Sequence, residues 1–279
     1  MILDILLSLG IAVKGPEGLV LAADSRVTVV VQPKPPAQGA AFQVSFDNAR
    51  KVLQFVKPHT YVGAVTYGEG GIGLRSAPSF LPEFESSLPT NRLSIADFAQ
   101  RLSDFFMQQW RSASMPVPPQ YRGPGMTFVV GGFNDAEPYG RVYLFVIPYA
   151  PVPVEQNPNP GEFGITWGGQ REFVDRLIQG FDARVLDIAK TTLNLGPAQV
   201  QQLQQALAPL SMQVPIEFLA LQDCIDLAIF FIRTTIAAQE LSVGIRGVGG
   251  PIDVATITRV DGFKFIQQKQ LEGETATRT

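Results

Sequence analysis

Short apolar runs separated by turn residues dominate the first part of the chain. Residues 5–15 and 18–24 are strand-like and flank the sequence Gly-Pro-Glu-Gly, which predicts a β-hairpin. Residues 51–56 and 61–67 form a second pair of strand-like runs around a proline-containing turn, beyond a Pro/Gly-rich loop at 32–40. We therefore expect the chain to open with an antiparallel sheet of at least four strands.

The spacing of apolar positions becomes helical at residues 94–113. Ser94 followed by Asp97 resembles a capping box, with Asp in place of the usual Glu. One face of the predicted helix carries large apolar side chains, as expected of core packing: Ile95, Phe98, Leu102, Phe105, Phe106 and Trp110. Prolines at 116, 118 and 119 end the helix.

The rest of the chain alternates strands and helices in groups. Strands are predicted at 126–132 and 141–148, a Pro/Asn-rich loop at 149–161, helices at about 170–193, 197–208 and 216–239, and final strands at 252–259 and 262–267. Asp261-Gly262 between the last two strands is a strong hairpin signal. This order fits an α+β protein with two stacked antiparallel sheets and helices on their outer faces. We expect one domain over residues 1–267 and a disordered polar tail over 268–279.

The composition changes this picture in one respect, the expected partners. Hydrophobic residues make up 46% of the chain and charged residues only 17%, which favours an apolar surface covered by partner subunits. The formal net charge is −3 and the sequence pI about 5.3, so the concentrated basic face that nucleic-acid binding needs is not expected.

Cysteine and histidine are too scarce for metal or disulfide chemistry. The chain has one of each, Cys224 and His59, so it forms no internal disulfide and offers little for a zinc site. Cys224 falls in an apolar helical run and is expected to be a buried structural thiol. His59 follows Lys57-Pro58 and is expected in a solvated turn. We expect neither a cofactor nor a metal.

No segment of the sequence predicts a signal peptide or a membrane span. Residues 1–7 are apolar but lack a basic flank and contain Asp4. The most hydrophobic stretch, 218–238, is interrupted by Asp223, Asp226 and Arg233, which a membrane span tolerates poorly. We interpret it as a buried helix of a cytoplasmic protein that does not bind membranes.

Residues 10–26, GIAVKGPEGLVLAADSR, closely resemble the start of the mature β-type subunits of proteasomes, which are N-terminal nucleophile hydrolases. Weaker similarities continue to about residue 266: Lys51-Val52-Leu53 is similar to the family's lysine-bearing strand, residues 126–132 and 140–147 to its central strand pair, and residues 241–244 and 251–253 to its bacterial Anbu branch. The resemblance implies a four-layer αββα sandwich of two antiparallel sheets flanked by helices.

The resemblance also implies catalytic residues. In this family the side-chain hydroxyl of the first mature residue attacks the substrate, and its own α-amine, with a pKa near 8, is the base. Matched residue by residue, Ser8 takes the place of that nucleophile, Lys51 that of a lysine whose ammonium stabilises the developing alkoxide, and Asp24 that of the aspartate that holds the lysine. The mechanism requires that residues 1–7 are removed as a short propeptide.

Taken singly, the same three residues have simpler interpretations. Asp24 could cap a turn, Lys51 could be a solvated charge at a strand edge, and Ser8 could fill an apolar strand. Only their joint spacing, which matches that of the family, favours a catalytic role.

Three further positions correspond to places where the family has supporting residues. Arg26 completes the Ala-Ala-Asp-Ser-Arg motif, Gly168 falls where the family has a serine followed by glycine, and Ser242 is similar to its second supporting serine. The sequence departs from the family at Leu7, where glycine usually precedes the scissile bond, at Gly168 itself, and at Gln239, where an aspartate is usual. Leu7 crowds the tight turn that self-cleavage needs, and the missing glycine and serine favour a catalytically silent subunit; Anbu-like chains also deviate at the position of Gln239.

Three functions therefore compete. The first is an endopeptidase subunit that hydrolyses peptides or unfolded proteins with an N-terminal hydroxyl nucleophile inside an oligomer. The second is a catalytically silent, ring-forming structural subunit, and the third is a small-molecule amidase on the same fold. The resemblance implies self-association into a ring or another closed or helical oligomer, and it identifies no activating ATPase.

Overall fold

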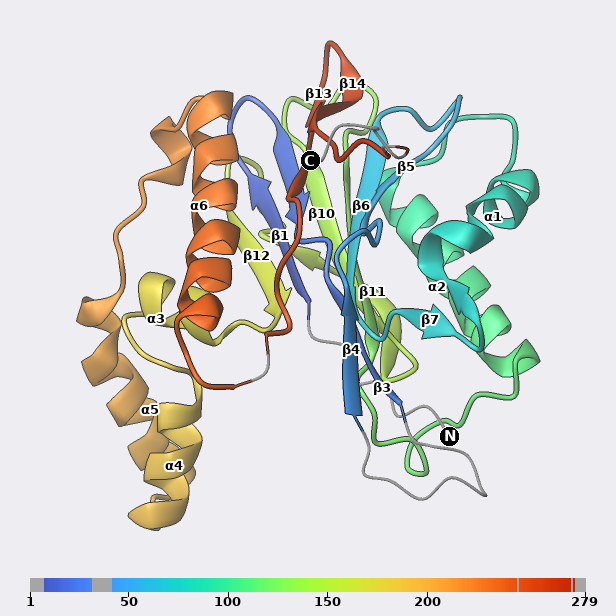
Figure 1. The fold of residues 1–279 in the computed structure, drawn as a ribbon. Coiled ribbons are helices and arrows are strands. Elements are labelled where there is room, and N and C mark those ends of the chain that lie inside the picture. Colours follow the sequence, from blue (N-terminus) through green and yellow to red (C-terminus); the bar gives the residue numbers. More distant parts are fainter. Residues whose placement is uncertain (1–7, 32–41, 245, 272, 274–279) are drawn as a thin grey trace, which may run out of the picture.

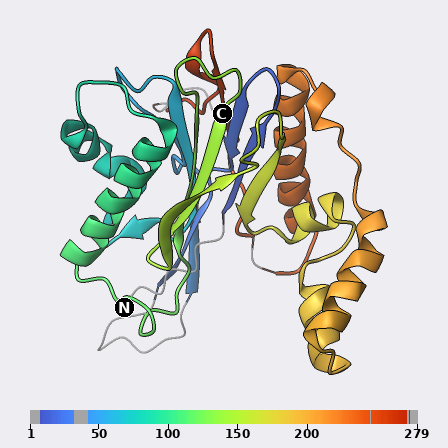
Figure 2. The ribbon, with the colours of Figure 1, turned by 180° about the vertical axis from the view of Figure 1, so that it is seen from behind.

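A computed structural model describes residues 8–31, 42–244, 246–271 and 273, and two five-stranded antiparallel sheets stack face to face at its centre (Figure 1). Helices cover the outer face of each sheet, so that the layers follow in the order helix, sheet, sheet, helix (Figures 1 and 2). This arrangement is the predicted α+β, αββα sandwich. The expected propeptide, residues 1–7, and the whole of the expected loop at 32–40 lie outside the described residues.

The first sheet carries the start of the described chain. Its strand order is β12 (Gly164–Gly169), β1 (Leu9–Lys14), β2 (Leu19–Ala23), β13 (Asp253–Thr258) and β14 (Gly262–Gln267). The predicted hairpin is confirmed, because Gly15 N–H donates to the Gly18 carbonyl at 3.0 Å between β1 and β2. The hairpin at Asp261-Gly262 is confirmed too, with Gly262 at φ +68°.

The second sheet has the order β11 (Ala150–Gln156), β10 (Arg141–Ile147), β9 (Met126–Gly132), β6 (Val62–Gly68) and β5 (Val52–Gln54). The prediction of a loop at 149–161 was wrong, because β11 occupies most of it. The strand contains two prolines, which suggested a loop, but β11 lies at the edge of the sheet. At an edge, a proline without an N–H group removes no ladder bond that the sheet needs.

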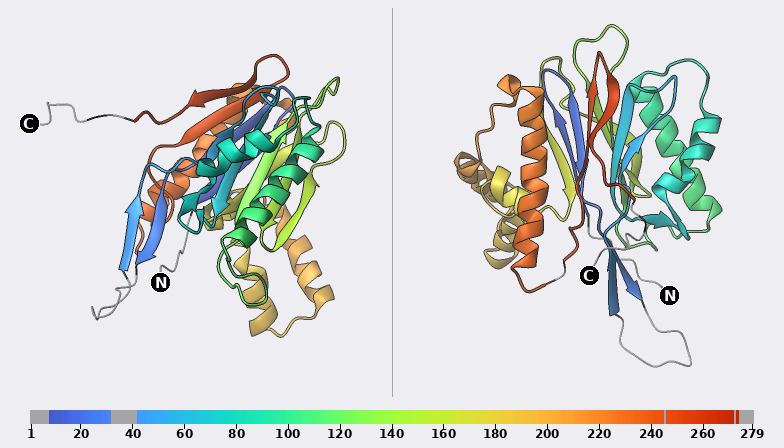
Figure 3. Two further views of the ribbon diagram at one scale, coloured as in Figure 1. Left: turned by 90° about the vertical axis from the view of Figure 1, so that its right-hand side faces the viewer. Right: turned by 45° about the horizontal axis from the view of Figure 1, so that its top comes forward.

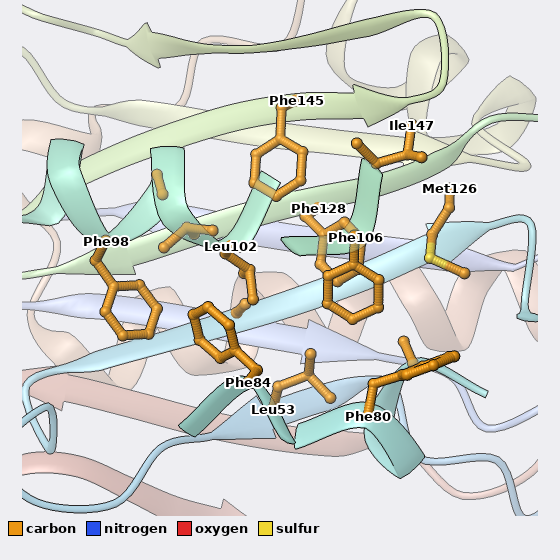
Figure 4. Packing of buried hydrophobic residues seen from close by; sticks show 14 of the residues in the cluster. Leu53, Phe80, Phe84, Phe98, Leu102, Phe106, Met126, Phe128, Phe145 and Ile147 are labelled. Atoms are coloured by element: carbon orange, nitrogen blue, oxygen red, sulfur yellow. The ribbon is translucent and has the colours of Figure 1, made fainter. Parts of the chain in front are cut away.

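Helices α1 (Leu81–Ser87) and α2 (Ile95–Ser112) cover the second sheet. The aromatic stripe predicted on α2 packs into a core with the sheet and α1, as Figure 4 shows for Phe84, Phe98 and Phe106. The capping box at its start forms only in part. Ser94 Oγ accepts from the Asp97 N–H at 3.1 Å, but the Asp97 carboxylate accepts from the Ser94 hydroxyl at 2.7 Å. The shorter Asp side chain therefore bonds to the Ser94 side chain.

Helix α6 (Leu221–Glu240) covers the first sheet with α3 (Glu172–Ile178), and a second core lies beneath them. One continuous helix was expected over 170–193, and this was wrong: α3 ends before Gly180 and α4 (Arg184–Thr192) follows. Gly180 has φ +80°, and a Cβ there would lie 2.2 Å from the Leu210 carbonyl oxygen, so the chain must turn at this point. Helices α4 and α5 (Pro197–Leu207) project away from the sandwich (Figure 1).

A third core fills the space between the two sheets, and the remaining elements are short. They are β3 (Val27–Val31), β4 (Phe42–Phe46), β7 (Gly71–Ile72), β8 (Arg75–Ser76) and the 3-10 turns Ala77–Phe80, Ala208–Leu210 and Ile216–Phe218. The strands β3 and β4 form a two-stranded ribbon that extends beyond the sheets (Figure 3).

The predictions for the unique cysteine and histidine have opposite outcomes. Cys224 is a buried thiol of α6, as predicted, and burial raises its pKa to about 11. His59 is 2% exposed and packs against Phe98 with ring centroids 5.2 Å apart, so the expectation of a solvated histidine was wrong. The turn that carries it is folded against α2. Among the described residues, no helix combines the length and apolar character that crossing a membrane requires.

Candidate active site

Lys51 and Asp24 form a buried ion pair where the two sheets meet. Asp24 follows the last residue of β2 in the first sheet, and Lys51 precedes the first residue of β5 in the second. The Lys51 Nζ donates to Asp24 Oδ1 at 2.7 Å, and their side chains are 6% and 0% exposed. The stacking of the sheets therefore brings together two residues that the sequence analysis paired.

The Asp24 carboxylate is surrounded by donors. Besides Lys51, the backbone N–H groups of Leu9, Arg26 and Gly249 donate to its two oxygens, each at 3.0 Å. The Leu9 contact links Asp24 to the residue that directly follows Ser8. The carboxylate thus fixes the start of β1 and the position of the Lys51 amine at the same time, so capping the turn at Arg26 is only one of its roles.

Lys51 is equally confined. Its Nζ also donates to the Arg26 carbonyl at 2.6 Å. Burial lowers the pKa of Lys51, and this effect outweighs the opposing attraction of Asp24, while the positive charges of Lys269 and Arg26 lower the pKa further. The amine is therefore a more acidic ammonium than a solvated lysine, and the prediction of a solvated strand-edge charge does not describe it.

Ser8 is the first residue that the structure describes, and it leads directly into β1. It is buried, and its carbonyl accepts from the Gln170 N–H at 2.7 Å. Gly169 makes this approach sterically feasible. It has φ +96°, and a Cβ at that position would lie 1.9 Å from the Ser8 oxygen.

Ser8 and Lys51 line the same pocket, which has a volume of about 480 Å³. Its walls come from the β4–β5 connection, β6 with the turn after it, the turn at 76–79, Asp253 and the segment 268–271. The residues on these walls include Asn48, Arg50, Thr66, Tyr67, Glu69, Ser76, Ser79, Asp253, Gln268 and Lys269. The nucleophile and the lysine that the sequence analysis predicted thus share one cavity large enough to hold part of a peptide.

A side chain from the opposite sheet, that of Tyr67, fills the space beside Gly168. Gly168 pairs with Gly10 across β1 and β12, and the ring of Tyr67 lies against both glycines. A Cβ on Gly168 would be 2.4 Å from the Tyr67 hydroxyl oxygen, and one on Gly10 would be 2.4 Å from a Tyr67 ring carbon. Tyr67 therefore fills the space where the resembled family places a serine side chain.

Arg26 and Ser242 differ in their distance from the pocket. The Arg26 backbone contacts both Asp24 and Lys51, while its guanidinium binds the Asp47 carboxylate at 2.6 and 2.8 Å. Asp47 raises the pKa of Arg26. Ser242 lies on the surface after α6, where its hydroxyl donates to the Gln239 carbonyl at 3.4 Å. It is not among the described residues that line the pocket.

Gln239 forms a structural bridge where the resembled family has an aspartate. Its side-chain amide donates to the Gln170 Oε1 atom at 2.6 Å and accepts from the Val248 N–H at 3.0 Å. Gln170 in turn holds the Ser8 carbonyl through its own N–H group. Gln239 therefore supports the Ser8 backbone from α6 without entering the pocket.

The pocket residues that sequence reasoning missed include Tyr67, Asp253 and Lys269. Tyr67 falls in an ordinary strand pattern, and only the glycines that receive its ring indicate a special position. Asp253 falls in the family-like motif at 251–253, which by itself assigns it no role in the site. Lys269 falls in the expected disordered tail, where a polar sequence gives no sign of a folded contact. Residues 272 and 274–279 of that tail lie outside the described residues.

The comparisons with known proteins support the fold. The chain is similar to the solved structure of a mutant of Anbu from Hyphomicrobium sp. strain MC1, with a TM-score of 0.52 and 16% sequence identity, over 94% of this chain and 87% of that one. No protein-family model matches the chain, and no curated protein matches it. The expectation of a proteasome-like, Anbu-like fold is therefore confirmed at the level of structure.

Proposed function

We propose that this chain is a proteasome-like peptidase subunit in which the Ser8 hydroxyl, after removal of residues 1–7, attacks peptide bonds. The observation that carries the proposal is the buried Lys51–Asp24 pair, whose lysine lines the same pocket as Ser8. Burying an ion pair costs several kcal/mol of desolvation, which only good geometry and further hydrogen bonds offset, so a buried pair at a pocket that Ser8 also lines favours a chemical role.

The proposed reaction begins with the Ser8 α-amine, which exists only after the Leu7–Ser8 bond is broken. This amine accepts the hydroxyl proton while Oγ bonds to the substrate carbonyl carbon. The Lys51 ammonium stabilises the alkoxide that develops, and Asp24 keeps Lys51 in place. The tetrahedral intermediate then collapses, and the leaving amine takes the proton from the α-ammonium. Water attacks the resulting ester of Ser8, which releases the second product and regenerates the hydroxyl.

We further propose that the chain works as an oligomer that encloses its substrates. Its low proportion of charged residues supports this, as do exposed apolar side chains on α4 and directly after it: Val185, Ile188 and Leu193. Unfolded proteins or peptides are the proposed substrates, because a compact folded protein could not bring its backbone into a pocket of about 480 Å³.

A silent, ring-forming subunit is the second candidate, and one observation favours it. Tyr67 occupies the space next to Gly168 where the resembled family has a supporting serine. A small-molecule amidase on the same fold remains the third candidate, and the pocket volume alone does not separate it from a peptidase.

Hydrolysis of fluorogenic peptides by the assembled protein tests the proposal. We expect Ser8→Ala to abolish hydrolysis, Ser8→Thr to retain it, and both variants to assemble like the wild type in analytical ultracentrifugation. An assembled wild-type protein whose peptide hydrolysis does not depend on Ser8 would overturn the proposal. Cleavage of small amides but not of peptides by the wild type would favour the amidase.

A further inference from the structure

A second lysine–aspartate pair is buried beside the first. The Lys269 amine forms an ion pair with the Asp253 carboxylate, and their side chains are 8% and 2% exposed. The Lys269 backbone N–H also donates to Asp253 Oδ1 at 2.9 Å, and its Nζ donates to the Ser25 hydroxyl at 2.8 Å. Lys269 is thus held at three points by residues far from it in the sequence.

The register of the first sheet makes the two pairs neighbours. Asp253 lies opposite Ala23 across β13 and β2, and Ala23 directly precedes Asp24. Ser25, which binds Lys269, directly follows Asp24, and its N–H donates to the Gly249 carbonyl at 3.0 Å. The end of β2 therefore serves both pairs, with Asp24 binding Lys51 and Ser25 binding Lys269.

The segment 268–271 is a wall of the Ser8 pocket. After β14 ends at Gln267, the chain leaves the sheet toward β5 and β6 (Figure 1), and three residues of the segment, Gln268, Lys269 and Leu271, line the pocket. Gln267 fixes the start of this path, because its side-chain amide donates to the Ile252 carbonyl at 2.7 Å. Lys269 is the residue that holds the segment in place beyond this point.

We propose that Lys269 is a positioning residue of the Ser8 site, an inference that rests on the proposed function. Its pair with Asp253 holds the segment 268–271 as a wall of the substrate pocket, and its amine sets the electrostatic environment of Lys51. A lysine buried only for stability would be unexpected here, because an apolar side chain would fill the same space without the desolvation of an ion pair.

The charges around Lys51 support the second part of this proposal. Asp24 attracts its proton, whereas Lys269 and Arg26 repel it, and Arg50, Glu69 and Asp253 line the same pocket. Removing the positive charge of Lys269 takes away one repulsion that lowers the pKa of Lys51, and a loosened pocket wall would reduce the burial of Lys51, which acts in the same direction. The pKa of Lys51 should therefore rise when Lys269 is neutralised.

The first test measures Lys51 itself and requires no enzyme activity. Trace acetylation of the full-length protein with acetic anhydride over a pH series, read by mass spectrometry of the Lys51 peptide, gives the midpoint of its titration. The variant is the double substitution Lys269→Met with Asp253→Asn, which removes both charges and leaves no buried aspartate unpaired. Lys264→Met, at an exposed position of β14, is the matched control.

We expect the Lys51 midpoint to move to higher pH in the double variant and to stay unchanged in Lys264→Met. An unchanged midpoint in a folded double variant would overturn the inference. If the midpoint moves but the wild-type protein hydrolyses no peptide, the proposed function fails while the placement of Lys269 stands, so the two failures are distinguishable.

The second test uses peptide hydrolysis. In the double variant we expect KM to rise several-fold, because the pocket wall loses its anchor, and the alkaline limb of the kcat profile to move to higher pH, because the Lys51 ammonium persists. Lys269→Arg keeps the charge and should retain the wild-type pH profile. A double variant with wild-type KM and an unshifted profile would contradict a positioning role.

Discussion

The Lys51 amine and the Asp24 carboxylate join the two sheets of this protein through a bond of 2.7 Å that is almost completely removed from water. Each partner also binds backbone groups of the same region: Asp24 accepts from the residue after Ser8, and Lys51 donates to the Arg26 carbonyl. The pair therefore links the fold of the site to its proposed chemistry, and changes to it should affect both.

Replacing one partner of this pair should destabilise the protein more than replacing both. Lys51→Met leaves a buried carboxylate without its ammonium, and such single changes typically cost about 3–5 kcal/mol. The variant that combines Lys51→Met with Asp24→Asn should recover much of that loss, because no buried charge remains. Urea unfolding of the single and double variants measures the effect.

Activity should behave differently from stability in the same variants. All of them lack the ammonium or its anchor, so we expect peptide hydrolysis to be lost in the double variant as well. A double variant that is both stable and active would show that the reaction does not need the pair.

The lowered pKa of Lys51 predicts opposite pH trends for activity and stability. Activity needs the ammonium, so it should fall as pH rises through the folded-state pKa of Lys51. Between that pKa and about 10.4, the value of an unfolded lysine, the unfolded chain binds more protons than the folded one, so the Lys51 contribution to stability increases with pH. The difference in unfolding free energy between wild type and Lys51→Met isolates this contribution; a difference that falls with pH in this window contradicts the account.

Tyr67 and Gly168 should be energetically coupled. A serine at 168 would place its Cβ 2.4 Å from the Tyr67 hydroxyl, and overpacking of this kind typically costs about 1–3 kcal/mol. We expect Gly168→Ser to be destabilising alone and much less so in a Tyr67→Ala background, measured as a double-mutant cycle by urea unfolding. Additive effects would mean that Tyr67 does not fill this space.

His59 should make the protein sensitive to acid. Burial lowers its pKa, so below about pH 6.5 the unfolded chain takes up a proton that the folded chain binds less readily, and stability is lost as pH falls toward the folded-state pKa. Because His59 is the single histidine of the chain, His59→Leu should remove this slope from unfolding free energies measured between about pH 5 and 8. A slope of the same size in both proteins would assign the acid sensitivity to carboxylates.

The sequence was sufficient for the layered architecture and for the pairing of Asp24 with Lys51. It was wrong on which strands share a sheet: the two hairpins expected in one four-stranded sheet, 5–24 and 51–67, lie in different sheets. Asp24 and Lys51 directly adjoin strands with strong apolar patterns, and the fold that those patterns favour brings the two residues together. Strand β11 was missed because a proline-rich edge strand has the composition of a loop. The break at Gly180 was missed because a glycine within a helical pattern signals a turn only when a tertiary contact, here with Leu210, requires one.

The rest of the pocket could not be predicted for a different reason. Lys269 and Tyr67 reach it through contacts between segments distant in the sequence, and neither lies in a pattern that distinguishes a buried polar group from an exposed one. The capping box at Ser94 was likewise predicted only in part. Whether the Asp97 carboxylate binds the Ser94 backbone N–H or the Ser94 hydroxyl depends on the length of the Asp97 side chain.

Intact-mass spectrometry of the freshly assembled wild-type protein, beside Ser8→Ala, tests the central claim most directly, because the proposed base is the α-amine of Ser8. We predict that the wild type has lost residues 1–7 and begins at Ser8, and that the Ser8→Ala variant keeps them. A wild-type protein that assembles and keeps residues 1–7 would have no free amine at Ser8, and it would contradict the proposed mechanism in favour of a structural subunit.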